Sequence, residues 1–307
     1  MFVTLAGGVG AARFLAGLTA VVPPEAVAAI VNTGDDLELY GLAISPDLDT
    51  VLYTLSGRVD PERGWGLAGD TTHVLEALAA LGEQPFFRLG DRDLATHLFR
   101  TARLRSGQTL TEVTALLAAR LGVRSQVLPM ANEPVRTRVI TPEGELAFQE
   151  YFVARGHRDD VLALRFVGAE AARPPPEALA ALAAARAIII APSNPFVSIG
   201  AILAVPGYRE VIATARVPRV AISPIVGGQA LKGPADRMLR TLGHEPSALG
   251  VARLYRSLVD CFVLDTLDAE LAPAVAALGM QPLVTNTIMR GPAERAALAR
   301  VVVEAVQ

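Results

Sequence analysis

Short apolar runs alternate with amphipathic stretches along most of the chain. The runs show little polar alternation, which is typical of parallel strands buried on both faces, and the stretches between them have helical spacing. The predicted strands are Phe2–Ala6, Val27–Val31, Ala187–Ala191, Val220–Ser223, Cys261–Asp265 and Pro282–Thr285. The predicted helices are Ala11–Ala20, Pro234–Thr241, Ala269–Leu278 and Pro292–Val306. This order predicts an α/β fold with a doubly wound, mostly parallel sheet.

Two segments interrupt this rhythm. The stretch from Asp93 to Leu121 carries two helical patterns with no strand between them, which predicts a small helical insertion over residues 93–122. The stretch from Gln126 to Val167 has the pattern of antiparallel strands, with Pro142-Glu143-Gly144 as a hairpin turn. A chain of 307 residues can form one large domain. We therefore expect a single domain, residues 1–307, that contains both segments.

Charge and hydropathy exclude two classes of protein. Lys and Arg number 28 against 31 Asp and Glu, a net charge of −3, whereas a nucleic-acid binder that acts through its field needs an excess of clustered cations. The longest uncharged run, Ala187 to Tyr208, is long enough to cross a bilayer but contains Pro192, Pro195 and Pro206. Because an uninterrupted helix cannot form there, we expect a soluble protein with no nucleic-acid or membrane partner.

The numbers and positions of the cysteine and histidine residues limit the kinds of metal site that the chain can form. The one cysteine, Cys261, excludes an internal disulfide and a cysteine metal cluster. The four histidines, His73, His97, His157 and His244, are not paired at ligand spacing. No basic segment precedes the first apolar run, so no secretory signal is expected and the predicted location is cytoplasmic. Any metal is expected to be a hard cation bound by carboxylates.

Glycines follow the first predicted strand directly, in Ala6-Gly7-Gly8-Val9-Gly10-Ala11-Ala12-Arg13. Glycines let backbone N–H groups approach a phosphate at a helix N-terminus, where the helix dipole favours anions. The stretch is neither a Walker A loop nor a complete dinucleotide fingerprint, and a tight strand-to-helix turn is the alternative. The residues predicted to bind a nucleotide here are Gly7, Gly8, Val9 and Gly10.

Acidic residues cluster after the second predicted strand. Asn32-Thr33-Gly34-Asp35-Asp36 follows it directly, and Ser45-Pro46-Asp47-Leu48-Asp49-Thr50 adds two more acids. Adjacent carboxylates repel one another unless they are solvated, hydrogen-bonded or share a cation. An all-oxygen site of this kind suits Mg²⁺ on phosphate oxygens. The alternative is that Asp47 and Asp49 only cap a helix.

Two further loops follow apolar strands, Ala191-Pro192-Ser193-Asn194-Pro195 and Ser223-Pro224-Ile225-Val226-Gly227-Gly228. With the glycine loop they would form a crevice for a nucleotide diphosphate at the strand ends, or they serve only as turns. Gly90-Asp91-Arg92-Asp93 either opens the helical insertion, with Asp93 as its N-cap, or presents Arg88 or Arg92 to a ligand. Lys232, the only lysine of the chain, either contacts a phosphate or reflects a bias toward arginine.

Taken together and in this order, these blocks resemble the 2-phospho-L-lactate transferase family, which acts in assembling the deazaflavin coenzyme F420. The resemblance runs from Phe2 to Met289. Its blocks are Leu5–Gly10, Asn32–Asp36, Ile44–Val51, Gly64–Gly66, Leu89–His97, Phe148–Glu150, Ala191–Pro195, Val197–Gly200 and Ser223–Ile225.

The resemblance implies a Rossmann-like core with a small helical insertion, working as a homodimer with Mg²⁺. It also implies transfer of a phospholactyl or phosphoenolpyruvyl group from a guanosine diphosphate-activated donor to the ribityl hydroxyl of the deazaflavin Fo, with release of GMP. Asp49 and Arg88 would contact Fo, Asp36 and Asp49 would hold the metal, and Asp49 would orient or deprotonate the attacking hydroxyl. The nucleotide would lie against the glycine loop and Ser193, Asn194, Ser223 and Pro224.

A different function class shares part of this pattern. Non-catalytic, nucleotide-sugar-binding regulatory proteins of a related fold carry the glycine loop and the Asn-Thr-Gly-Asp-Asp block. Leu37-Glu38-Leu39-Tyr40, where that group tends to be rich in glycine and serine, and the Leu89–His97 block favour the transferase. The sequence does not distinguish a lactyl from an enolpyruvyl or glyceryl unit on the donor.

Overall fold

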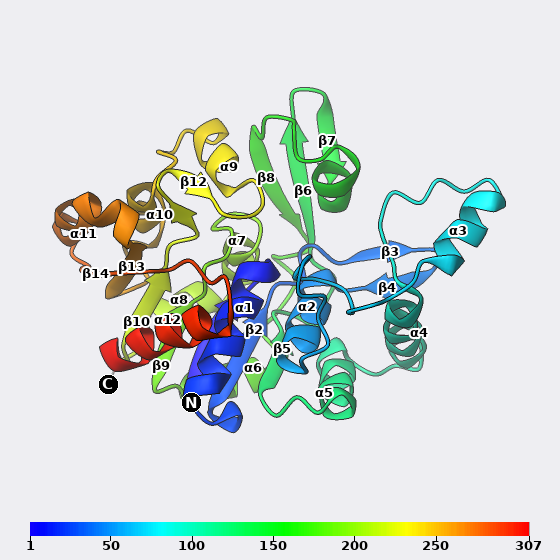
Figure 1. The fold of residues 1–307 in the computed structure, drawn as a ribbon, viewed down its shortest axis with the longest axis horizontal. Coiled ribbons are helices and arrows are strands. Elements are labelled where there is room, and N and C mark those ends of the chain that lie inside the picture. Colours follow the sequence, from blue (N-terminus) through cyan, green and yellow to red (C-terminus); the bar gives the residue numbers. More distant parts are fainter. Residues whose placement is uncertain (307) are drawn as a thin grey trace.

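The computed structural model describes residues 1–306 and is built around a seven-stranded sheet (Figure 1). The strand order is β14-β13-β10-β9-β1-β2-β5, and neighbouring strands are parallel throughout. The strands are β1 (Phe2–Ala6), β2 (Val27–Val31), β5 (Gln126–Pro129), β9 (Ala187–Ile190), β10 (Arg219–Ile222), β13 (Cys261–Asp265) and β14 (Gln281–Thr285). The predicted α/β class with a mostly parallel sheet is confirmed.

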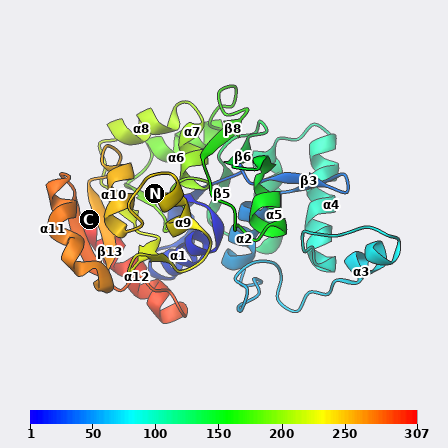
Figure 2. The same cartoon turned by 90° about the horizontal axis from the view of Figure 1, so that it is seen from above.

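Both faces of this sheet are covered by helices, as Figure 2 shows from above. On β1 the side chains of Phe2 and Ala6 lie in one apolar core and those of Val3 and Leu5 in the other, as the alternation of a strand requires. The first core contains residues of α1 (Gly8–Val21), α2 (Pro46–Leu55), α5 (Leu110–Leu121) and α12 (Pro292–Ala305). The second contains residues of α6 (Pro176–Ala183), α7 (Ile199–Ala204), α8 (Tyr208–Thr214), α9 (Ala235–Thr241) and α10 (Ala248–Tyr255).

The predicted elements of the core are present with shifted boundaries. Helix α1 begins at Gly8, so the glycine stretch forms its first turn. The predicted helix Ala269–Leu278 divides into η3 (Thr266–Leu271) and α11 (Ala272–Ala277), with non-helical backbone angles at Asp268.

The segment predicted as a helical insertion folds into α4 (Asp91–Arg105) and α5. The carboxylate of Asp70 caps α4 by accepting from the N–H groups of Arg92 and Asp93, so the prediction of Asp93 as the N-cap was wrong. Helix α5 packs against α2 and β5 on the main sheet, while α4 lies farther out with α3 (His73–Ala80) (Figure 1).

The prediction that Gln126 to Val167 forms only antiparallel strands was partly wrong. Its first strand, β5, joins the edge of the main sheet and pairs in parallel with β2. Helix α5 packs on β5 and forms the last part of the crossover from β2, so β5 runs in the same direction as β2. The rest forms the antiparallel sheet β7-β6-β8, with the predicted turn between β6 and β7. These strands are β6 (Arg136–Thr141), β7 (Gly144–Ala147) and β8 (Ala163–Val167).

Smaller elements complete the fold. The hairpin of β3 (Leu37–Leu39) and β4 (Leu42–Ile44) turns at Tyr40 and Gly41, which both have positive φ, as its tight turn requires. The others are η1 (Pro24–Ala26), η2 (Glu150–Ala154), β11 (Ile225–Val226) and β12 (Gln229–Ala230). Within residues 1–306, no helix has the length and apolar character needed to cross a bilayer.

Candidate active site

The site lies where the strand order reverses. From β1 the chain builds outward through β2 and β5 on one side, and through β9, β10, β13 and β14 on the other. The loops after β1 and β9 therefore leave the sheet in different directions, which is where open α/β sheets bind ligands.

The two loops touch at this point. The N–H of Gly7 donates to Ser193 Oγ at 3.2 Å, and a Cβ on Gly10 would collide with the carbonyl oxygen of Pro192. A Cβ on Gly7 would lie 2.5 Å from Ser198 Cβ and 3.0 Å from Asp47 Oδ2. Glycine is thus required at both positions. The glycine loop and the loop after β9 meet, and the predicted binding of a nucleotide diphosphate there stays a prediction.

Several of the predicted nucleotide-binding side chains shape the loops themselves. Asn194 Oδ1 accepts from the N–H groups of Phe196 and Val197. Ser223 Oγ donates to the carbonyl of Ile225 and accepts from its N–H. Pro224 follows Ser223 in the same turn. Hydroxyl and amide groups therefore hold these loops in place, and their contact with a nucleotide stays a prediction.

The acidic block after β2 is joined to α2 by hydrogen bonds. Asn32 Nδ2 donates to Asp47 Oδ2 at 3.0 Å, and Ser45 Oγ donates to Asp36 Oδ2 at 2.7 Å. Asn32 Oδ1 accepts from the N–H of Gly34. Neither Asp47 nor Asp49 is the N-cap of α2, which is Ser45. The alternative that Asp47 or Asp49 is the N-cap of α2 was therefore wrong, and a metal or substrate role for them stays a prediction.

Burial disfavours the charged forms of the acids in this cluster. It raises the pKa of Asp36 to about 7 and that of Asp47 to about 6, since a charged form is disfavoured away from water. The pKa of Asp35 is also raised well above its usual range, by burial and then by the charges of Asp47 and Asp36. Among the described residues, Asp35 Oδ1 and Asp36 Oδ1 are buried without a hydrogen-bond partner. Unpartnered carboxylate oxygens that repel one another suit a divalent cation.

A cleft of about 530 Å³ opens beside these acids. It runs between the acidic block and the three-stranded sheet, with apolar side chains from Leu37, Phe86 and Phe148 in its walls. Arg136 and Arg138 of β6 also line it. The cleft thus combines apolar walls with charged groups at the edge of the acidic cluster, a combination typical of small-molecule sites.

Asp49 is not among the residues that line this cleft and is held by a buried arginine. Arg100 of α4, which has no exposed surface, pairs with both oxygens of Asp49: Nη2 with Oδ1, and Nη1 with Oδ2 at 3.1 Å. Burial alone would lower the pKa of Arg100, but the charge of Asp49 and the hydrogen bond to it raise that pKa. The ion pair joins α2 to the helical insertion.

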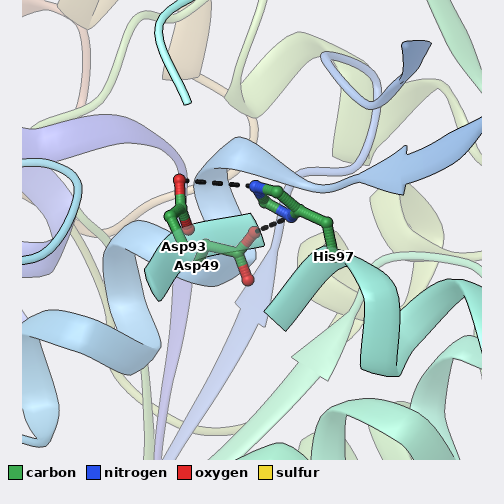
Figure 3. Close-up of side chains that lie close together, drawn as sticks. All are labelled: Asp49, Asp93 and His97. Carbon is green, nitrogen blue, oxygen red and sulfur yellow. Dashed lines mark ion pairs between the residues drawn. The ribbon is translucent and has the colours of Figure 1, made fainter. Parts of the chain in front are cut away.

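Two more residues of α4 extend this network (Figure 3). His97 lies with Nδ1 3.6 Å from Asp49 Oδ2 and Nε2 3.3 Å from Asp93 Oδ2. Tyr53 of α2 donates to Asp93 Oδ1 at 2.6 Å. Burial opposes ionisation of Asp93, yet the close approach of His97, the hydrogen bond from Tyr53 and the charge of Arg100 keep its pKa below the usual value.

Asp49, Asp93 and His97 bring three potential metal ligands within 4.8 Å of one another. Arg100 already places a positive charge at this point, because its Nη1 lies 3.1 Å from Asp49 Oδ2 and 3.3 Å from His97 Nδ1. We therefore interpret the group as a charge-compensated network. The acids with unpartnered oxygens, Asp35 and Asp36, fit a cation better.

Arg88 is exposed and lines a small hollow together with Trp65 and Asp93. Asp93 also belongs to the network around Asp49, so the two residues predicted to bind Fo lie in the same region of the structure. Their contact with Fo stays a prediction.

Arg100 was not among the predicted site residues, and His97 had no predicted role. A signal was present: Asp93, His97 and Arg100 recur at i, i+4 and i+7, which places them on one face of a helix. Polar residues at that spacing are equally typical of a solvated face, so spacing alone could not identify a buried network.

Comparison with known proteins decides the family. A family model described as 2-phospho-L-lactate transferase CofD matches residues 2–292. The chain belongs to the CofD family. A protein of Streptomyces griseus named phosphoenolpyruvate transferase is 46% identical, with 98% of this chain and 97% of that protein covered. A protein of Methanosarcina mazei named 2-phospho-L-lactate transferase is 38% identical, with 99% of both covered.

These matches confirm the family and the transferase class predicted from the ordered motifs. The CofD fold also has a relative among solved structures, a protein of Bacillus halodurans described as a member of the UPF0052 family. Its TM-score is 0.66 over 98% of both chains, at 16% sequence identity. At that identity the match shows the shared fold alone.

Replacing Arg100 tests the buried pair in this CofD member. Arg100→Met leaves Asp49 buried without its partner, so we expect a loss of about 3–5 kcal/mol in the free energy of unfolding. Arg100→Lys keeps the charge and should lose less. Urea denaturation measures both. Arg105→Met, on the exposed part of the same helix, is the control, and an equal loss there would contradict the prediction.

The raised pKa of Asp36 predicts a pH dependence of stability. Because the folded value, about 7, exceeds the unfolded one, ionisation costs stability as pH rises between them. With a chelator present, unfolding free energy should fall from pH 5.5 to pH 8, and Asp36→Asn should reduce that fall by on the order of 2 kcal/mol.

Denaturation curves at the two pH values measure this difference. Asp160→Asn, which changes an exposed aspartate in a surface ion pair, controls for the loss of one negative charge. If Asp36→Asn and the unmodified protein have the same pH dependence, burial does not raise the pKa of Asp36.

Proposed function

We propose that this protein transfers a phosphoenolpyruvyl or phospholactyl group from a guanosine diphosphate-activated donor to the ribityl hydroxyl of the deazaflavin Fo, in coenzyme F420 biosynthesis. The observation that carries the proposal is the membership of the CofD family over residues 2–292. Support comes from the glycine loop and the acidic cluster, which meet at the switch point of the sheet.

The reaction is a substitution at phosphorus. The hydroxyl oxygen of Fo forms a bond to the distal phosphorus of the donor, and the bond from that phosphorus to the bridging oxygen breaks. GMP leaves with the bridging oxygen and its electron pair, and the hydroxyl proton is released to a base. Such transfers depend on positioning and charge neutralisation and need no nucleophile from the protein.

Mg²⁺ is part of the proposal. Asp36, with an unpartnered buried oxygen, and Asp49 are proposed to hold it, and Asp35 offers a further unpartnered oxygen. Asp49 would do so while it keeps its pair with Arg100, and its charge acts on Asp36. A bound Mg²⁺ would neutralise charge on the diphosphate of the donor.

Asp49 is the residue proposed to act on the attacking hydroxyl. Arg100 donates to both of its oxygens, which fixes the orientation of the carboxylate. In that orientation Asp49 is proposed to accept a hydrogen bond from the hydroxyl. Arg88, exposed beside Asp93, is proposed to bind Fo next to it. The loops with Ser193, Asn194, Ser223 and Pro224 are proposed to lie along the guanosine diphosphate.

The donor carries either of two three-carbon units. The relatives named phosphoenolpyruvate transferase from Streptomyces species are 46% and 47% identical, against 38% for the Methanosarcina mazei protein named for phospholactate. We therefore propose phosphoenolpyruvyl as the first unit to test. A homodimer working in the cytoplasm completes the proposal, and size-exclusion chromatography with light scattering tests the dimer.

Mass spectrometry of reaction mixtures tests the proposed function. Purified protein is incubated with Mg²⁺, Fo and the phosphoenolpyruvyl or phospholactyl donor in separate reactions. We expect a phosphodiester of Fo together with GMP, formed faster from the phosphoenolpyruvyl donor. Absence of product from both donors would overturn the proposal, and retention of UDP-sugars in preference to guanosine nucleotides would then favour a regulatory binding protein.

Replacement of Asp49 tests its role. Asp49→Asn removes the charge that positions the hydroxyl, so turnover should fall by about 100-fold or more. Initial rates of GMP release measure the effect, and the melting temperature verifies folding. Asp160→Asn is the matched control on the surface, with turnover expected to stay unchanged. Near-normal turnover in folded Asp49→Asn would remove Asp49 from the reaction.

A further inference from the structure

A group of positive charges lies beside the glycine loop. It consists of Arg13 of α1, Lys232 in the loop between β12 and α9, and Arg295 of α12. A Cβ on Gly64 would lie 2.7 Å from Val9 Cγ1, 3.5 Å from Arg13 Nη2 and 3.8 Å from Lys232 Nζ. Both cationic groups are therefore close to a residue of the glycine loop.

Arg295 belongs to the same group of cations because its helix, α12, packs against α1, which carries Arg13. Helices α1 and α12 cross at Gly17, where a Cβ would collide with the carbonyl of Arg295. Arg13 lies one turn before Gly17 on α1, so its side chain extends along the same face. The charge of Arg13 acts on both Lys232 and Arg295.

These cations have no acidic partner. No ion pair between described residues includes any of the three, and the Nε atoms of Arg13 and Arg295 are buried without a hydrogen-bond partner. Burial and then the charge of Arg13 lower the pKa of Lys232 and of Arg295, the latter opposed by Glu294. Like charges that are partly buried together destabilise the structure unless an anion lies among them.

Neighbouring backbone groups favour the same kind of ligand. The N–H groups of Val9 and Gly10 lie in the first turn of α1 and have no carbonyl partner within the helix. The positive end of the helix dipole adds to the field there. Lys232 Nζ donates to the carbonyl of Arg63, which fixes the ammonium group beside Gly64.

We propose that Arg13, Lys232 and Arg295 form an anion subsite that binds phosphate oxygens of a diphosphate lying against the first turn of α1. Guanidinium groups match phosphate oxygens in pairs, and the ammonium group adds a point charge. The identity of this diphosphate as that of the guanosine donor rests on the proposed function.

Calorimetric titration with inorganic pyrophosphate, in buffer with no added metal, tests the subsite on the full-length protein. Arg13→Met and Lys232→Met should each weaken pyrophosphate binding by about tenfold, because each removes a charged hydrogen-bond donor. Lys232→Arg should restore binding to within about threefold, since it keeps the charge. Arg120→Met, an exposed arginine on α5, is the charge control and should bind as the unmodified protein does.

Pyrophosphate affinities of Arg13→Met and Lys232→Met within twofold of the unmodified protein would overturn the subsite, as would a failure of the unmodified protein to bind millimolar pyrophosphate. If Arg13→Met does not fold, Lys232→Met in its exposed loop still decides. The outcome is separate from that of the transfer assay. Weakened pyrophosphate binding in a protein that forms no Fo product would support the subsite and contradict the transferase proposal.

Discussion

The missing side chains of Gly7 and Gly10 are the constraint on which the site depends. They let the start of α1 pack against Pro192, Ser198 and Asp47 at once. Strands β1 and β9 are neighbours whose chains diverge, so no other part of the sheet could bring the glycine loop, the acidic block and the loop after β9 together. Any side chain at these two positions would push the three segments apart.

Charge is divided around this contact. Asp35, Asp36 and Asp47 are buried together with their pKa values raised, while the cations beside Val9 have no acidic partner among the described residues. In contrast, Asp49 is fully compensated by Arg100. The two uncompensated groups are the parts of the structure that an outside ion or ligand would stabilise, whereas the pair with Arg100 fixes the orientation of Asp49.

The sequence predicts the core of the fold well because buried parallel strands are continuous apolar runs, as in Val27–Val31 and Cys261–Asp265. It fails at β5, since an edge strand of four residues carries too little pattern to show its partner. The loops of the site follow from strand ends, but the Arg100–Asp49 pair does not. A buried arginine 51 positions from its partner depends on how α4 packs, and local patterns do not contain that information.

The spacing of Asp93, His97 and Arg100 has a consequence for how the outer helix can vary among related chains. Each added residue turns a helix by about 100°. An insertion inside α4, between Asp93 and His97, would turn Asp93 and the end of the helix that Asp70 caps away from the face that carries His97 and Arg100. Lengthening beyond Arg105 would leave that phase unchanged. Helix α4 is therefore free to change length only at its C-terminal end, beyond Arg105.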